Sequence, residues 1–73
     1  MENTNPTTAV RFIRTKEVCE KTGLSKSSIY DLMAQGQFPR TVRLSESGRG
    51  VAFLEGEVDS WMASRIAARN VAA

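Results

Sequence analysis

The sequence has no histidine and a single cysteine, Cys19, among its 73 residues. Without imidazole side chains the chain cannot form a histidine-based catalytic triad or use the commonest general base at neutral pH. One thiol cannot form an internal disulfide, and zinc sites built from Cys and His are excluded. We expect Cys19 to be a small buried apolar side chain. Because no spacing of Ser, Asp or Lys resembles a nucleophile motif, we predict no enzyme activity and no cofactor or metal.

Long apolar runs are also missing from the chain. No stretch approaches the roughly 20 apolar residues that cross a bilayer, and the N-terminus lacks the apolar core of a signal peptide. We therefore expect a cytoplasmic protein without a membrane partner. The polar residues 1–10 are predicted to be a disordered tail, residues 11–69 one small folded domain, and residues 70–73 a frayed end.

Charge is unevenly distributed along the chain, although the net charge is only +2. Residues 11–53 contain eight Lys and Arg against four Asp and Glu, whereas residues 54–73 contain two against three. A positive field over the front two thirds favours a nucleic-acid partner. A solvated surface of mixed charge is the alternative explanation of the same residues.

Two short helices joined by a tight turn are predicted near the front of the folded region. Thr15 is expected as the N-cap of a first helix over residues 16–22, with Phe12 and Ile13 packed beneath its start. Gly23 is typical of the left-handed position that follows a helix. The first helix is therefore short and ends in a sharp change of direction.

The second helix is predicted from its two ends. Ser25 is a strong N-cap for a helix over residues 26–35, and Gly36 ends it. Ile29 marks the centre of its buried face, with Leu32 and Met33 beside it. Two helices with a glycine-containing turn are the helix-turn-helix pattern, whose second helix can enter the DNA major groove.

A hairpin and a third helix complete the domain. Phe38 is expected to anchor the connection to a β-hairpin over residues 40–53, whose loop is polar and contains two glycines. A third helix is predicted over residues 55–69. Its apolar stripe consists of Val58, Trp61, Met62 and Ile66, with Trp61 as the largest core contributor. The predicted fold is mainly α with a small β-hairpin, a winged helix-turn-helix of three helices plus a wing.

Five short motifs, in order and at their spacing, carry a family resemblance. They are EV at residues 17–18, TGLS at 22–25, SIY at 28–30, GxFP at 36–39 and EVDSW at 57–61. With them the folded region resembles the AlpA family of phage and prophage regulators, small winged-helix DNA-binding proteins related to excisionases and to MerR-type DNA-binding domains. The resemblance implies regulation near a mobile-element promoter, often one that controls an integrase or excision. Asp31 and Phe53 depart from the family pattern, in which a basic or polar residue and a tryptophan are expected.

The predicted DNA-binding residues lie on the second helix and around the hairpin. They are Lys26, Ser27, Ser28, Tyr30 and Asp31 on the helix, and Arg40, Arg43 and Arg49 on the hairpin or its approaches. The lysine adds a cation at a helix N-terminus, and hydroxyl groups can donate to bases or phosphates. The two serines are also ordinary first-turn residues, and the tyrosine is equally explained by packing.

Asp31 and Arg49 have opposite expected effects. A carboxylate near phosphates is unfavourable unless it accepts from cytosine N4 or orients a cation, so we expect Asp31 to tune sequence preference and weaken non-specific binding. Arg49 lies between glycines at the hairpin tip and is the best candidate to reach the minor groove or the backbone. A solvated loop arginine is the alternative.

These features predict a sequence-specific transcriptional regulator of a phage or prophage element, with double-stranded DNA as its partner. Two other functions stay open. One is an excisionase-like architectural factor that bends DNA, and the other is a protein-interaction module that binds an integrase or another regulator. We call the second helix the reading helix, since it is expected to contact bases. Because this helix is short and the chain has one wing, one monomer contacts few bases, and a second copy on DNA is an expected partner.

Overall fold

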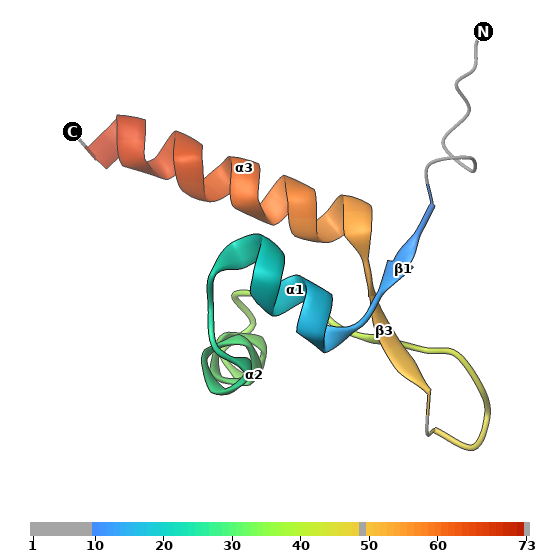
Figure 1. Ribbon diagram of the computed structural model, residues 1–73. Coiled ribbons are helices and arrows are strands. Elements are labelled where there is room, and N and C mark those ends of the chain that lie inside the picture. The colour runs from blue at the N-terminus through green and yellow to red at the C-terminus, as the bar shows by residue number, and fades with distance from the viewer. Residues whose placement is uncertain (1–9, 49, 73) are drawn as a thin grey trace, which may run out of the picture.

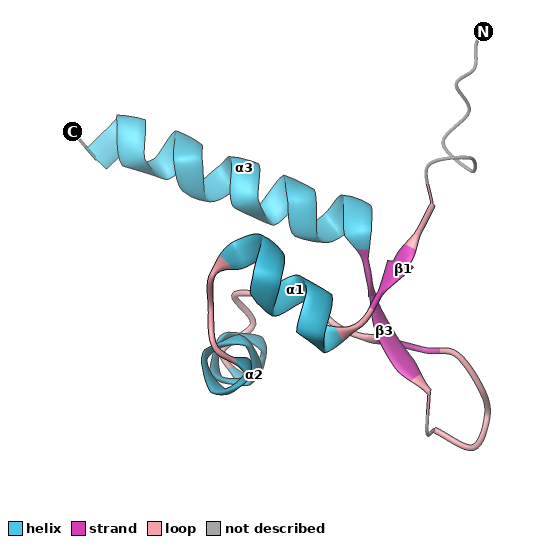
Figure 2. Cartoon of the chain, in the orientation of Figure 1, coloured by secondary structure: helices cyan, strands magenta, loops and turns pink. Residues whose placement is uncertain are grey.

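The structure is a computed structural model that describes residues 10–48 and 50–72, with side chains described as far as residue 69. Helix α1 lies between α3 and α2, and the strands lie to one side of the helices (Figures 1 and 2). The disordered tail predicted for residues 1–10 lies, apart from Val10, outside the described residues. The mainly helical arrangement with a small antiparallel sheet confirms the predicted fold class.

Helix α1 (Thr15–Thr22) begins one residue earlier than predicted. Its N-cap is Arg14, which has an extended conformation and makes no side-chain cap, so the assignment of Thr15 as the N-cap is wrong. Arg14 is extended because it directly follows a strand, which leaves Thr15 as the first helical residue. At the other end Gly23 has φ of 77°, and its N–H donates to the Cys19 carbonyl at 2.8 Å, which confirms the left-handed end.

Helix α2 (Lys26–Ala34) begins where its cap predicts. The Ser25 side chain accepts a hydrogen bond from the Ser28 N–H at 3.1 Å, and Ile29 is completely buried. Leu32 and Met33 are half-buried against the core, as expected from the period of 3.6 residues. The buried side of α2 is thus fixed, and its other side faces solvent.

The sheet has three strands in the order β1-β3-β2, all antiparallel. The predicted hairpin is formed by β2 (Val42–Arg43) and β3 (Val51–Leu54). Strand β1 (Phe12–Ile13) was not predicted, because two residues show no alternation and their partner strand follows much later in the sequence. Ile13 is buried as expected, whereas Phe12 is 48% exposed on the opposite face instead of packing beneath α1.

Helix α3 (Glu55–Ala72) packs against the body of the domain only along its first half. Val58 is fully buried, and Trp61 and Met62 are half-buried. Ile66 is 55% exposed, so the prediction that the apolar stripe continues to this residue is wrong. The helix continues past its last core contact, and nothing in the described residues covers that side of its second half.

The core is centred on Phe53 rather than on Trp61. The Phe53 side chain is completely buried, and Phe38 packs edge-on against it with ring centroids 5.8 Å apart. Trp61 packs on Phe38 from the outside at 4.8 Å, and its indole N–H donates to the Gln37 carbonyl at 2.8 Å. The tryptophan therefore ties the end of the α2 connection to α3, and the expected anchor role of Phe38 is confirmed.

Candidate nucleic-acid interface

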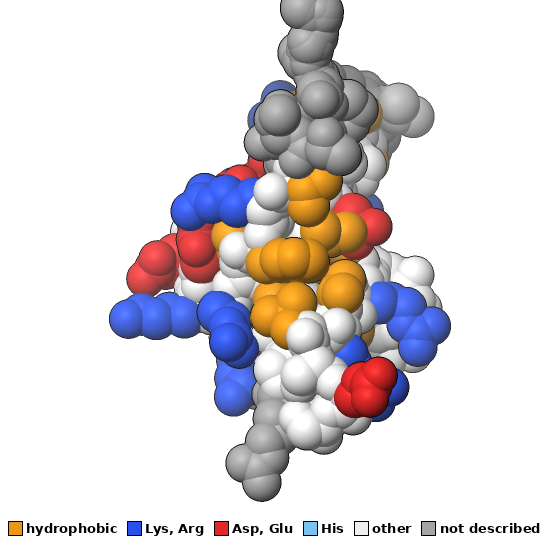
Figure 3. All heavy atoms as spheres, turned by 90° about the vertical axis from the view of Figure 1, so that its right-hand side faces the viewer, with side chains coloured by type: hydrophobic (Ala, Val, Ile, Leu, Met, Phe, Trp, Pro, Cys, Tyr) orange, Lys and Arg blue, Asp and Glu red, His pale blue; other side chains and the backbone are white. Residues whose placement is uncertain are grey.

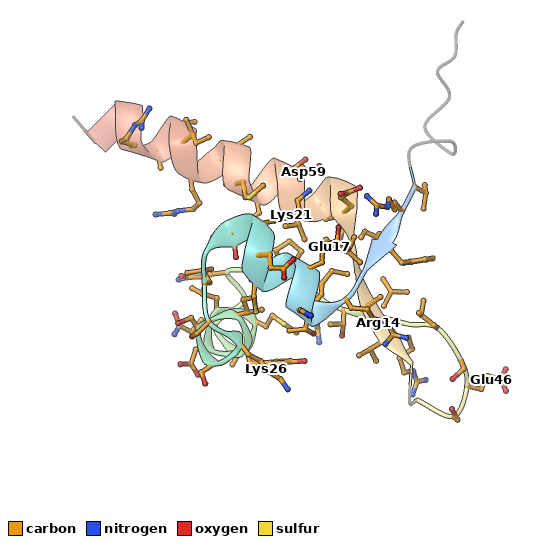
Figure 4. All side chains as sticks on the ribbon, in the orientation of Figure 1. Arg14, Glu17, Lys21, Lys26, Glu46 and Asp59 are labelled. Carbon is orange, nitrogen blue, oxygen red and sulfur yellow. The ribbon has the colours of Figure 1, made fainter. Side chains whose placement is uncertain are left out.

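The exposed side of α2 carries four of the five DNA-binding residues predicted on that helix. Lys26, Ser27 and Asp31 are exposed, and Tyr30 is 40% exposed. Ser27 and Asp31 are one helical turn apart and therefore neighbours on the surface, as are Lys26 and Tyr30. In Figure 4 the Lys26 side chain extends from α2 on the side away from α3. These four residues form one polar face that a DNA groove can reach.

Ser28 differs from the other residues on α2 because it belongs to the cap. Its N–H donates to the Ser25 hydroxyl oxygen, and the Ser25 hydroxyl in turn donates to Ser28 Oγ at 3.0 Å. The side chain is half-buried. This pair holds the first turn of α2, and the Ser28 hydroxyl keeps its own proton for donation to a further acceptor.

The wing is the loop between β2 and β3. The Leu44 N–H donates to the Gly50 carbonyl at 2.6 Å and closes the loop, and Gly48 turns the chain at φ of 80°. Arg43 is exposed at the base of the wing, and its Nη1 lies beside Gly48. Pairing with Val51 places Arg43 on the face of the sheet that carries Phe53, which is the face toward the helices.

Arg14 is a cation at the wing that sequence reasoning missed. Its Nη1 donates to the Val51 carbonyl at 3.1 Å, so it links the start of α1 to β3. Figure 4 shows Arg14 at this junction. Arg43 is the backbone partner of Val51 in the β2–β3 pairing, so both arginines neighbour the same residue of β3. Only the unpredicted extended segment before α1 brings Arg14 there, so its sequence position gave no signal beyond its charge.

The remaining two predicted arginines differ in placement. Arg40 is exposed and lines a groove between residues 36–42 and α3, apart from the polar face of α2. Arg49 lies outside the described residues, so its reach to the minor groove stays a prediction. The structure thus brings together the residues on α2, and it places Arg14 and Arg43 together at the base of the wing.

A second group of charges lies between α1, β1 and α3. Lys21 Nζ is 3.0 Å from Glu55 Oε2 and 2.9 Å from Asp59 Oδ1, and Arg11 lies 3.2 Å from Glu55. The hydrogen bonds to Asp59 and Glu55 raise the pKa of Lys21, and the hydrogen bond from Lys21 lowers the pKa of Glu55. Arg11 also lies 3.8 Å from Glu17. Two of the cations counted in the basic front of the sequence are therefore neutralised by acids.

Outside this network the described cations lack such partners. No described carboxylate lies within 4.0 Å of these exposed residues: Arg14, Lys16, Lys26, Arg40 and Arg43. In Figure 4, Lys21 and Asp59 lie between α1 and α3, whereas Lys26 and Arg14 lie on the other side of α1. Lys26 on α2 and Arg14 and Arg43 at the wing base thus belong to the exposed cations without a described carboxylate partner, which also include Arg65 and Arg69 on α3.

Other kinds of site find little support in the described residues. No group of three His, Cys, Asp or Glu side chains among them is placed to share a metal ion. No described helix is both long and apolar enough to pass through a membrane. Cys19 is half-buried and packs against the core, which fits a small apolar side chain rather than an exposed thiol.

A helix-turn-helix with a capped second helix, followed by a wing and a bracing third helix, is the winged helix-turn-helix class. The chain belongs to the family of the prophage CP4-57 regulatory protein (AlpA), whose family model matches residues 11–66. The match begins just before β1 and ends in α3 at Ile66, the first residue of the apolar stripe that lies exposed. The family therefore covers the whole packed domain.

Two curated relatives support the same assignment. The chain is 50% identical over 63 residues to the uncharacterized protein ORF88 of Enterobacteria phage P4, covering 86% of this chain and 69% of that protein. It is 31% identical over 67 residues to the DNA-binding transcriptional activator AlpA of Escherichia coli K12, covering 84% of this chain and 93% of that protein. The similarity to a phage protein and to a transcriptional activator spans nearly all of this chain.

Proposed function

We propose that the chain is a sequence-specific DNA-binding transcriptional regulator of a phage or prophage element and that it controls integrase or excision genes. Membership of the AlpA family and similarity to an activator of that name support DNA binding. The observation that carries the proposal is the exposed polar face of α2 with Lys26 at its start, on the side of α1 away from the Lys21–Asp59 ion pair (Figure 4).

In this proposal the N-terminal half of α2 enters the major groove, which is wide enough for a helix. Lys26 and the first-turn N–H groups meet a phosphate, and Ser27 and Asp31 face base edges. Ser28 and Tyr30 contact bases or the backbone from the margins of this face. The exposed hydroxyl groups and the carboxylate supply the donors and acceptors that base recognition needs.

The wing supplies the second set of contacts. Arg14 and Arg43 meet the backbone at the wing base, where Arg14 also holds β3 through the Val51 carbonyl. Arg49 reaches the minor groove or the backbone from the wing tip. Arg40 contributes to DNA binding only if the duplex extends beyond the wing base, because it lines the groove beside α3.

A footprint on the DNA flanking the coding region of this protein and any neighbouring integrase gene tests the proposal. We expect one or more short protected sites, and we expect the Lys26→Ala variant to lose them at moderate salt. Matched DNA from an unrelated gene is the control. Absence of protection at low salt, with the protein shown to be folded by circular dichroism, would contradict the proposal.

The same sites separate regulation from the two other functions. A regulator protects a promoter and changes transcription from it in a purified system. An architectural factor bends the DNA strongly, which shifts the mobility of fragments that carry the site at different positions. A protein-interaction module shows no salt-dependent affinity for DNA.

A further inference from the structure

The outer face of the sheet is apolar. Strand pairing and alternation put four residues on this face: Phe12, Leu54, Ala52 and Val42. The chain continues this surface with Val10, which is 57% exposed, and with Leu44, which is 43% exposed. Figure 3 shows a strip of hydrophobic side chains on this side of the molecule, with Lys and Arg on both sides of it. We call the strip of Val10, Phe12, Val42, Leu44 and Leu54 the outer strip.

The outer strip leads into a groove of about 1170 Å³ beside α3. Val10, Val42 and Leu54 belong to both the strip and the groove, so the two surfaces are continuous. Phe38 and Trp61 line the groove further along. Because the indole N–H of Trp61 is already bonded to the Gln37 carbonyl, the ring offers apolar surface to anything that lies in the groove.

Arginines surround this apolar surface. Arg40, from residues 36–42, and Arg65, from α3, both line the groove, and both are exposed without a described carboxylate within 4.0 Å. Arg11 is also in the lining, but Glu55 already pairs with it. Glu57 is the one carboxylate among the described lining residues. The groove therefore offers apolar contacts between two unneutralised guanidinium groups.

We propose that the outer strip and the groove bind an acidic amphipathic segment of another protein. Its apolar side chains lie on the strip and against Trp61, and its carboxylates meet Arg40 and Arg65. Contiguous exposed apolar surface with a polar rim is typical of protein-binding sites, and arginine binds carboxylates through two parallel donors. A phosphate backbone would meet the same arginines but would leave the apolar strip exposed to water.

This binding function is separate from the proposed DNA binding. The groove is lined by residues 36–42, the ends of the sheet and α3, and by no residue of Lys26–Ala34. An acidic segment can therefore bind while the reading helix contacts DNA. The proposal thus adds a protein partner on a surface apart from α2, and Arg40 is the residue that both the groove and the proposed DNA contacts include.

Two synthetic helical peptides test the proposal on the full chain. One has Leu and Phe on one face and Glu on the other, and its matched control has Lys in place of Glu. Trp61 is the only tryptophan of the chain and reports binding by its fluorescence. We expect the Glu peptide to change the Trp61 emission and to shift the backbone resonances of residues 36–42 and α3. We expect the Lys peptide to bind at least about tenfold more weakly.

Charge reversal assigns the effect to the groove. Arg65→Glu is expected to weaken the Glu peptide by at least about fivefold and to strengthen the Lys peptide. Arg69→Glu is the matched control, since Arg69 is one turn further along α3, exposed and absent from the groove lining. The DNA affinity of the Arg65→Glu variant should stay within about twofold of that of the original protein. This expectation does not depend on whether the protein controls integrase or excision genes.

Several results would overturn the proposal. Equal binding of both peptides would show that the surface does not select acidic segments. Equal effects of Arg65→Glu and Arg69→Glu on the Glu peptide would show that the overall charge of the protein, and not the groove, controls binding. Changes in Trp61 emission that occur without peptide and grow with protein concentration would show that a second copy of this chain occupies the surface. Nuclear Overhauser contacts from residues 1–9 to Trp61 in the free protein would assign it to the chain itself.

Discussion

Lys21 and Lys26 flank the same turn but lie in opposite electrostatic surroundings. Lys21 lies between two carboxylates of α3, which hold it in place and raise its pKa. Lys26 begins α2 and is exposed without a described acidic partner. We call the side with the ion pairs of Lys21 the braced side. The side with Lys26 and the wing base, where the cations have no described acidic partner, is the open side. A net charge of +2 is therefore compatible with unpaired cations at the start of α2 and at the wing base, because acids pair with Arg11 and Lys21 instead.

Removal of cations from the open side should have the largest effect. We expect the Lys26→Ala, Arg14→Ala double variant to bind its DNA site about a hundredfold more weakly, because each lost contact with a phosphate is worth ~1.5 kcal/mol. The slope of log affinity against log salt should fall by about two. Fluorescence anisotropy with labelled duplex between low and moderate salt measures both quantities.

The braced side supplies the control for this experiment. Lys21→Ala should leave DNA affinity within about twofold and the salt slope unchanged, while it lowers the melting temperature because Glu55 and Asp59 lose their shared cation. If Lys21→Ala reduced DNA affinity as strongly as the double variant, net charge rather than its placement would control binding.

The braced and open sides could be predicted from the sequence to different degrees. Gly23, Ser25 and Gly36 fix the ends of the helices locally, so the helix-turn-helix was predicted almost to the residue. Ile29 was predicted as the buried centre of α2, which also identified the opposite face as exposed. Capping and periodicity act within a few residues, and a single sequence carries both signals in full.

The contacts between distant segments could not be predicted in this way. Strand β1 consists of two residues that pair with β3. A two-residue strand shows no alternation, and no short turn connects it to β3, so the sequence does not indicate the pairing. Arg14 and Lys21 depend on it for their partners, because β1 fixes where α1 begins relative to β3 and α3. The charge imbalance between residues 11–53 and residues 54–73 is real. However, Lys21 and Glu55 belong to different halves of that comparison, although they form an ion pair in the structure.

Asp31 offers a smaller test, on the open side alone. Asp31→Asn should strengthen binding to random-sequence DNA about threefold to tenfold at low salt, because one negative charge near the phosphates is removed while a hydrogen-bonding side chain remains. The gain should shrink as salt screens the charges. Glu20→Gln, an exposed acid on α1, is the matched control and should change little. Equal gains from the two variants would remove Asp31 from the reading face.

The smallest expected effect is the pH dependence of the braced side. The folded-state pKa of Glu55 lies below its ordinary value of 4.5 because Lys21 donates to it, so Glu55 contributes stability above that ordinary value. This contribution is lost as the pH falls through the lowered pKa. The Glu55→Gln variant should therefore lose less stability than the original protein between about pH 5 and pH 3.

Urea unfolding at a series of pH values measures this difference, and Glu20→Gln is the control for loss of an exposed acid outside the ion-pair network. Lys21 acts in the opposite direction, since its pKa is raised: its contribution is present below its ordinary pKa and is lost as the pH rises through the higher folded-state value. DNA affinity at neutral pH should be the same in both Gln variants. If Glu55→Gln weakened DNA binding while the protein stayed folded, the ion pairs would also position the reading helix, and the two sides would not be independent.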